Sequence, residues 1–355
     1  MNIYCNSCYK QDIERGIHTS FPWKKLQNKS IMASGATGLI GSFLIDVILE
    51  KNVQDGLNCT VYALGRNKEK AIARFSKYAE DPHLVFVQYD VKFPLKMEDV
   101  HTVDYVLHLA ANTHPMLYAT DPIGTITTNL IGAQNMLEFS VEHNATRFLF
   151  ASSNEMYGEN RGDVEFFDED YCGYINCNTL RAGYPESKRC SEALCQAYKQ
   201  QKGLDVVIAR LTRSYGPTMS MSDTKAVSQF IKKGIAGEDI VLKSEGTQYF
   251  SYTYMADAVS GLLWVLLAGE NGEAYNIADE SGDIQLKDLA ANIAAVNGKE
   301  VVFEIPDAVE ASGYSKATKA RLNGAKLKKL GWAPKYGIRT GMERTISILK
   351  SLTEE

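Results

Sequence analysis

The chain has 355 residues, of which 45% are hydrophobic and 23% charged, and its formal net charge is −5. This composition is typical of globular proteins, and the length suffices for a large core in one or two domains. The sequence has no basic tract, so we expect no nucleic acid partner. The longest apolar run, residues 259–268, is too short to span a bilayer, and residues 1–16 lack the apolar stretch of a signal peptide. We therefore expect a cytoplasmic protein without membrane contact.

The seven cysteines are an odd set without the spacing of a disulfide framework, which is typical of a reducing compartment. Cys5 and Cys8 form a CxxC pair. Zinc would need two further ligands, and Cys172 and Cys177 have a loose spacing, so we expect no metal.

The chain begins with a polar extension, residues 1–28, which we expect to pack as a cap on the outside of the first domain. Residues 29–34 are typical of a strand and are followed by the glycine-rich run 35–41 and an apolar helical pattern. Glycines in such a turn let the backbone approach a pyrophosphate, whose charge the helix N-terminus stabilises. The alternative is a tight turn without a ligand. We predict dinucleotide binding by Gly35, Thr37, Gly38, Leu39, Ile40 and Gly41.

Strand patterns then alternate with helical stretches at residues 60–64, 84–89, 105–109, 147–151 and 206–211. This alternation predicts an α/β protein with a Rossmann-type, doubly wound parallel sheet. A dinucleotide would lie along the carboxyl ends of the strands. We therefore expect the cofactor to contact Asp90, Val91, Leu109, Ala110 and Ala111.

The second strand lacks the acidic residue that usually ends it in NAD-binding sheets, where it holds the ribose diol. Its end reads Gly65, Arg66, Asn67, Lys68. Arg66 would attract the ribose phosphate of NADP. We therefore expect NAD or NADP as cofactor, with Arg66 favouring NADP, unless Arg66 and Lys68 are solvated loop charges.

Tyr184 and Lys188 lie four residues apart and share one face of a predicted helix. A fixed ammonium near a phenol favours the phenolate, so this spacing allows Tyr184 to act as a base. The pair also occurs by chance on many solvated helices. Its significance therefore depends on the motifs around it.

Five motifs occur in a fixed order: GATGLIG, HLAA, the serine-rich strand end before MYG, YPESK and RSYGP. In this order they resemble the extended short-chain dehydrogenase/reductases, specifically the nucleotide-sugar epimerase/dehydratase group, over residues 29–334. SSNEMYGEN, LRAGYPESKRCSEALCQAYKQ and GPTMSMSDTKAVSQFIKKGIAGEDI look most like UDP-glucuronate decarboxylases. The dTDP-glucose 4,6-dehydratases look second closest.

The resemblance implies that Ser153, Tyr184 and Lys188 are catalytic. Tyr184 would take the proton of the sugar C4 hydroxyl while hydride leaves C4 for the nicotinamide. Lys188 would lower the pKa of Tyr184 and, like Tyr184, contact the cofactor, and Ser153 would hydrogen-bond the reacting oxygen. The resulting 4-ketone makes a carboxylate on C5 labile.

Glu155 lies two residues beyond Ser153 and would face the same pocket. In the dehydratases a glutamate here takes the C5 proton, and an adjacent aspartate protonates the departing hydroxyl. This chain has Asn154 there, which cannot donate a proton as an acid does. Decarboxylation needs no such acid, and epimerisation at C5 could also use Glu155. We therefore expect catalysis by Glu155 in a decarboxylase-like enzyme that makes activated sugars for polysaccharides.

Other readings stay open. A 4,6-dehydratase or an epimerase is the first alternative, and a plain reductase is a weaker one. A non-catalytic dinucleotide-binding sensor is the alternative from another class, because a fold alone does not give a function. Sensors tend to lose the catalytic tyrosine or lysine, whereas this chain keeps both.

The resemblance also implies the domain organisation. Residues 29–217, with 253–268 returning to them, would form the dinucleotide-binding domain. Residues 218–252 and 269–355 would form a smaller, mixed α/β substrate-binding domain. A homodimer would form through the helices around residues 129–141 and 186–200.

Two positions depart from the family pattern, in which Asn usually stands at position 213 and Arg at position 250. The chain has Arg213 and Phe250 instead. We expect the substrate, a nucleotide-diphosphate sugar, to contact Asn154 and Arg213. The alternative is that Arg213 is a surface charge.

Overall fold

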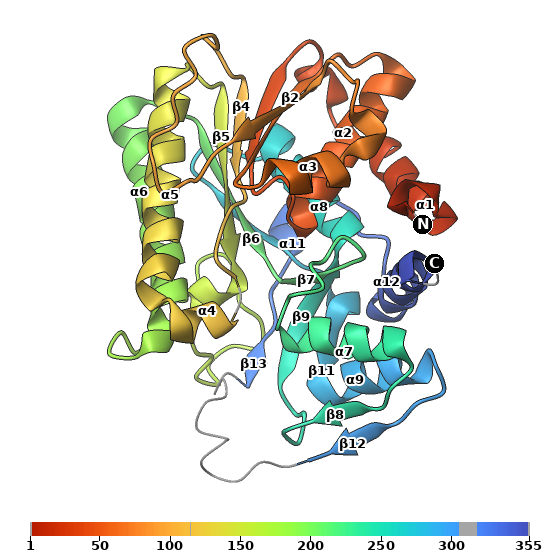
Figure 1. The fold of residues 1–355 in the computed structure, drawn as a ribbon. Coiled ribbons are helices and arrows are strands. Elements are labelled where there is room, and N and C mark those ends of the chain that lie inside the picture. The colour runs from red at the N-terminus through yellow and green to blue at the C-terminus, as the bar shows by residue number, and fades with distance from the viewer. Residues whose placement is uncertain (1, 114, 305–317, 354–355) are drawn as a thin grey trace.

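A computed structural model describes residues 2–113, 115–304 and 318–353. Its centre is a seven-stranded parallel sheet with the strand order β10-β6-β5-β4-β1-β2-β3 (Figure 1). The strands are β1 (Ser30–Ser34), β2 (Thr60–Gly65), β3 (Leu84–Gln88), β4 (Tyr105–His108), β5 (Arg147–Ser153), β6 (Val206–Leu211) and β10 (Ala274–Ile277). The Rossmann-type, doubly wound sheet expected from the sequence is confirmed.

Helices cover both faces of this sheet, because its strands are apolar on both sides. Ile31 and Ala33 of β1 belong to one core cluster, and Met32 between them belongs to the other. On one face α2 (Leu39–Asp55) packs with α8 (Met255–Ala268), and on the other α5 (Pro122–Glu142) packs with α6 (Gly183–Lys202) (Figure 1). Shorter elements connect these layers: α3 (Lys68–Arg74), η3 (Ser76–Tyr78), α4 (Pro115–Thr120), η4 (Asn154–Tyr157) and η5 (Leu180–Ala182).

A second group of elements lies below the large sheet in Figure 1. Four short strands form one sheet, and two more pair separately: β7 (Arg213–Tyr215), β9 (Tyr249–Tyr254), β11 (Asp283–Gln285), β13 (Lys319–Ala320), β8 (Ile240–Leu242) and β12 (Val301–Phe303). They pack with α7 (Ala226–Ala236), α9 (Leu286–Ala295), α12 (Ile338–Thr353) and η6 (Glu280–Gly282), whereas α11 (Ala325–Lys329) packs against β10 and α8. Strand β10 lies within the range 269–355 expected for the second domain, yet it pairs with β6 in the large sheet.

The N-terminal extension contacts both parts of the molecule. It contains η1 (Ile3–Cys5), α1 (Ser7–Ile17) and η2 (Trp23–Leu26), and α1 packs against α2, α8 and α12. The N- and C-terminal helices therefore lie side by side (Figure 1). In the part of the chain that the structure describes, no helix is both long and apolar enough to cross a lipid bilayer.

Two buried carboxylates fix this extension in place. Asp46 of α2 accepts hydrogen bonds from Tyr4 Oη, at 2.8 Å, and from Tyr9 Oη, and it pairs with Arg74. Asp12 of α1 accepts a hydrogen bond from Tyr254 Oη at 2.6 Å. The extension is therefore anchored to the core as well as covering it.

Candidate active site

The glycine-rich turn joins β1 to α2 at the carboxyl edge of the sheet. Gly35 has φ +72°, and a Cβ there would lie 2.9 Å from the Ala110 nitrogen. A Cβ on Gly41 would lie 2.4 Å from the Gly35 carbonyl oxygen. Helix α2 begins at Leu39, and its N-cap residue Gly38 makes no side-chain capping bond. No side chain therefore caps the first N–H groups of the helix, and uncapped N–H groups at a helix N-terminus can bind a phosphate.

Ser34 joins the ends of β1 and β4. Its buried hydroxyl oxygen accepts from the backbone nitrogens of Leu109, at 3.1 Å, and Ala110, at 3.2 Å. The same hydroxyl lies 2.9 Å from His108 Nδ1. Burial and the charge of Lys188 lower the pKa of His108 to about 3, so this imidazole is neutral. His108 is therefore a buried, neutral residue directly before the predicted cofactor residues Leu109 and Ala110. The next predicted residue, Ala111, is half-buried.

The other predicted cofactor residues lie at neighbouring strand ends. Val91 is buried, and its carbonyl oxygen accepts from Asn135 Nδ2 at 2.8 Å. The half-buried Asp90 accepts from the Lys92 nitrogen at 3.1 Å. Arg66 is exposed directly after β2. The fold thus aligns these residues along one edge of the sheet, where parallel strands end together.

Tyr184 lies in the first turn of α6, and Ser153 is the last residue of β5. Burial and the nearby Glu155 raise the pKa of Tyr184 above its ordinary value, and these effects outweigh the opposite effect of the hydrogen bond between Tyr184 and Ser153. Lys188 was expected to lower this pKa. Its Nζ instead donates to the Ala151 carbonyl oxygen at 2.7 Å and lies 6.0 Å from the centroid of the Tyr184 ring. Burial lowers the pKa of Lys188 to about 8.

Two further residues of this site were not predicted from the sequence. Arg181 pairs with Glu155, with 2.7 Å between Nη2 and Oε2, and its Cζ lies 4.8 Å from the centroid of the Tyr118 ring. Tyr118 stacks on Tyr184 with 5.0 Å between ring centroids. The only feature of the sequence that could have indicated Arg181 is its position three residues before Tyr184, in the motif LRAGYPESKRCSEALCQAYKQ. No feature of the sequence indicates Tyr118.

The predicted substrate residues lie on different elements. Asn154 is buried in η4, directly after β5. Arg213 begins β7, and its Cζ lies 3.6 Å from the centroid of the Phe250 ring on β9. The two positions that depart from the family pattern are therefore in direct contact with each other.

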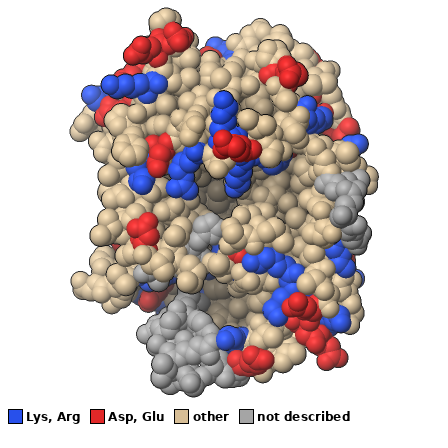
Figure 2. Space-filling model, in the orientation of Figure 1, with Lys and Arg blue, Asp and Glu red and all other residues tan. Residues whose placement is uncertain are grey.

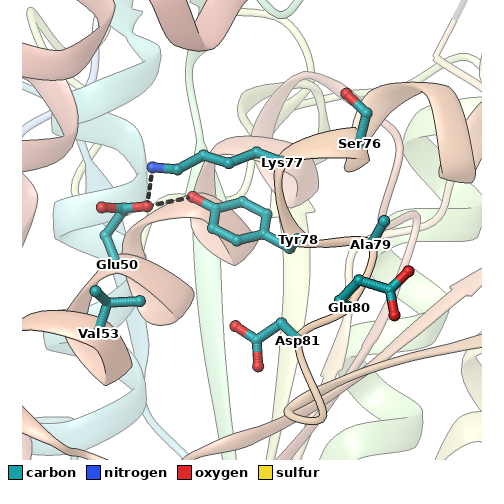
Figure 3. Close-up of a pocket in the computed structure, with 8 residues that line it drawn as sticks. All are labelled: Glu50, Val53, Ser76, Lys77, Tyr78, Ala79, Glu80 and Asp81. Atoms are coloured by element: carbon teal, nitrogen blue, oxygen red, sulfur yellow. Dashed lines mark hydrogen bonds and ion pairs between the residues drawn. The ribbon is translucent and has the colours of Figure 1, made fainter.

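Surface hollows elsewhere do not coincide with these residues. One of about 300 Å³ is lined by residues of α2 and the segment 76–81, and there Glu50 accepts from Lys77 and, at 2.9 Å, from Tyr78 Oη (Figure 3). Another, of about 370 Å³, contains the buried pair Arg210 and Glu192. Within each of these two hollows, polar side chains pair with one another, as Glu50 does with Lys77 and Arg210 does with Glu192. The face in Figure 2 has a central hollow with Lys and Arg side chains gathered along its upper side.

A comparison with known families gives the classification. Residues 31–278 match the model of the NAD dependent epimerase/dehydratase family. The chain belongs to this family. The resemblance predicted from the sequence motifs is confirmed, and so is the fold.

Relatives within the epimerase/dehydratase family include UDP-glucuronic acid decarboxylases. UDP-glucuronic acid decarboxylase 5 of Arabidopsis thaliana is 32% identical over 315 residues, which cover 89% of this chain and 87% of the relative. UDP-glucuronic acid decarboxylase 1 of Xenopus tropicalis is 31% identical and covers 97% of this chain and 78% of the relative. In fold, the chain matches the dTDP-glucose 4,6-dehydratase DesIV of Streptomyces venezuelae, solved with NAD bound, with a TM-score of 0.77 at 24% identity. That match covers 91% of this chain and 97% of DesIV.

Proposed function

We propose that this protein decarboxylates UDP-glucuronate through a transient 4-keto sugar, with NAD or NADP as an internal hydride carrier. The observation that carries the proposal is the interaction of Ser153 with Tyr184, with Lys188 one turn along α6, at the same carboxyl edge of the sheet as the glycine-rich turn. The similarity to decarboxylases over most of the chain supports the choice of reaction.

The reaction begins with oxidation at C4 of the sugar. When bound, the dinucleotide accepts the C4 hydride, and Tyr184 takes the proton of the C4 hydroxyl. Ser153 hydrogen-bonds the same oxygen and so holds it near the phenol. Burial raises the pKa of Tyr184, so its action as a base would require a positive charge close to the phenol.

The next steps take place at C5. The C5–carboxylate bond breaks, carbon dioxide leaves, and its electron pair is delocalised into the 4-ketone. C5 then gains a proton, and hydride returns to C4 while Tyr184 gives its proton back. The overall reaction is redox neutral and yields a UDP-pentose. Glu155 lies two residues beyond Ser153 and is the group proposed to handle protons at C5.

Asn154 separates this proposal from dehydration. An amide cannot supply the proton that a departing C6 hydroxyl requires. Epimerisation at C5 would use the same Glu155 and remains the competing reaction. A sensor without catalysis is disfavoured, because the chain retains Ser153, Tyr184 and Lys188.

The test is mass spectrometry of UDP-glucuronate incubated with the purified protein and each dinucleotide. Loss of carbon dioxide is the expected result, and the matched control Tyr184→Phe should bind dinucleotide without turnover. Product at unchanged mass would indicate epimerisation. Turnover by Tyr184→Phe at the wild-type rate would refute the assignment of the base.

The proposal includes two further features. The exposed Arg66 and the absence of an acid after β2 support NADP as the dinucleotide. The exposed side chains of Ile123, Ile126 and Ile131 on α5 support a homodimer through α5 and α6.

A further inference from the structure

Arg213 lies at the junction of the two domains, close to the catalytic segment. Leu211 of β6 pairs in register with Ser153 of β5. Because a strand rises about 3.3 Å per residue, the Arg213 backbone is at most about 7 Å farther along the chain, toward the carboxyl edge. Arg213 then pairs with Tyr252 of β9 in the smaller sheet. It therefore stands where a substrate would pass from the catalytic residues to the second domain.

The guanidinium of Arg213 is held by an aromatic ring and not by a carboxylate. Its Cζ lies 3.6 Å from the centroid of the buried Phe250 ring. Other arginines in the described part of the chain form ion pairs, namely Arg74, Arg147, Arg181, Arg189, Arg210, Arg321, Arg339 and Arg344. No ion pair is recorded for Arg213 among the described residues. Its Nη1 is buried and lacks a hydrogen-bond partner there as well.

A buried, unpaired guanidinium nitrogen is energetically costly, because it has lost water and gained no acceptor. Stacking on Phe250 fixes the plane of the guanidinium but satisfies none of its N–H groups. A planar fork of N–H donors matches two oxygens of a phosphate or a carboxylate. An anionic ligand would therefore complete the site.

We propose that Arg213 binds an anionic oxygen pair of the nucleotide-sugar substrate, with Phe250 as the residue that positions it. The proposal rests on the function proposed above. Two groups of UDP-glucuronate have this chemistry, namely the diphosphate and the sugar carboxylate. Arg213 thereby determines which substrates bind on the second-domain side of the site.

The experiment is calorimetric titration of the full chain, preloaded with dinucleotide, with UDP, UDP-glucose and UDP-glucuronate. We compare the wild type with Arg213→Ala and Arg213→Lys, and use Arg339→Ala as the control, because Arg339 is an exposed arginine of α12. Arg213→Ala should weaken binding about 10- to 100-fold, as expected for a charged hydrogen bond. Arg213→Lys keeps the charge without the fork and should give an intermediate affinity.

The three ligands distinguish the two sources of the anion. Weaker binding of all three by Arg213→Ala assigns the diphosphate, whereas weaker binding of UDP-glucuronate alone assigns the carboxylate. Unchanged binding of all three by folded Arg213→Ala, verified by its circular dichroism spectrum, would overturn the inference while leaving the proposed function intact. A wild-type protein that binds none of the three would overturn both.

Discussion

Arg181 and Glu155 form an ion pair across the candidate active site, with 2.7 Å between Nη2 and Oε2. The pair joins the segment before α6 to the segment after β5. Arg181 also lies over Tyr118, which in turn stacks on Tyr184. The proposed proton-transfer group at C5 is thus linked by direct contacts to the proposed base at C4.

The first prediction concerns Glu155. Glu155→Gln should keep oxidation at C4, because Ser153 and Tyr184 are untouched, yet slow overall turnover by ~10²- to 10⁴-fold, the usual range for loss of a general acid or base. Reduced dinucleotide, followed by its absorbance during a single turnover, should then accumulate. Wild-type turnover in Glu155→Gln would remove Glu155 from the mechanism.

The second prediction concerns the buried charge of Lys188. Its pKa in the folded chain is lowered to about 8 from 10.5, so the charged form is penalised on folding. Below pH 8 both the folded and the unfolded chain carry the proton on Lys188. Burial of the charged amine then lowers the free energy of unfolding by its full amount. As the pH rises from about 8 to 10.5, the folded chain loses the Lys188 proton before the unfolded chain does. The destabilisation caused by burying the charge therefore disappears over this range.

Lys188→Met should therefore abolish turnover and increase the free energy of unfolding at pH 7 by about 1–3 kcal/mol, after the lost hydrogen bond to Ala151 is allowed for. The gain over the wild type should shrink when urea unfolding is repeated near pH 10. A variant that is less stable than the wild type at pH 7 would contradict the prediction.

The third prediction concerns cofactor choice. Arg66→Asp should weaken NADP binding by ~10- to 100-fold and spare NAD, because the new carboxylate repels the ribose phosphate and accepts from a ribose diol. Fluorescence titration with each dinucleotide measures the ratio. Lys68→Asp, at an exposed position in the first turn of α3, is the control. Equal weakening of both cofactors by Arg66→Asp would argue against a role for Arg66 in selectivity.

The fourth prediction concerns the N-terminal extension. The Asp12 side chain is fully buried and pairs with Arg344, with 2.8 Å between Nη2 and Oδ1, besides accepting from Tyr254. Asp12→Ala leaves these donors unpaired, so the free energy of unfolding should fall by about 3–5 kcal/mol. Glu14→Ala, at an exposed position of the same helix, should change it by less than about 0.5 kcal/mol. If Asp12→Ala unfolded at the same temperature as the wild type, the interactions of Asp12 would not be needed for stability.

The fifth prediction concerns self-association. Ile123 is 76% exposed on α5, and the exposed Ile126 and Ile131 add further apolar surface to the same helix. If α5 forms the dimer interface, Ile123→Glu should convert a dimer to a monomer in sedimentation velocity at micromolar concentration. Ile72→Glu, which changes an isoleucine that is 57% exposed on α3, should leave the dimer intact. A monomeric wild type would rule out the proposed interface.

The sequence by itself determined the fold class and the family. The glycine turn, the strand and helix alternation and the motif around Tyr184 are local patterns, and local patterns report backbone conformation and periodicity directly. The predicted strands of the large sheet were therefore found at nearly the expected residues. Strand β10 was not anticipated, because a short apolar run does not reveal which sheet it joins.

Only the tertiary structure decided which distant residues meet. Asp12 and Tyr254 are 242 residues apart in the chain, and nothing in either neighbourhood indicates the other. The stacking of Arg213 on Phe250 and the pairing of Arg181 with Glu155 likewise depend on the path of the chain. Periodicity shows which side of an element is buried, but the identity of the partner is fixed by packing between elements, which no single segment encodes.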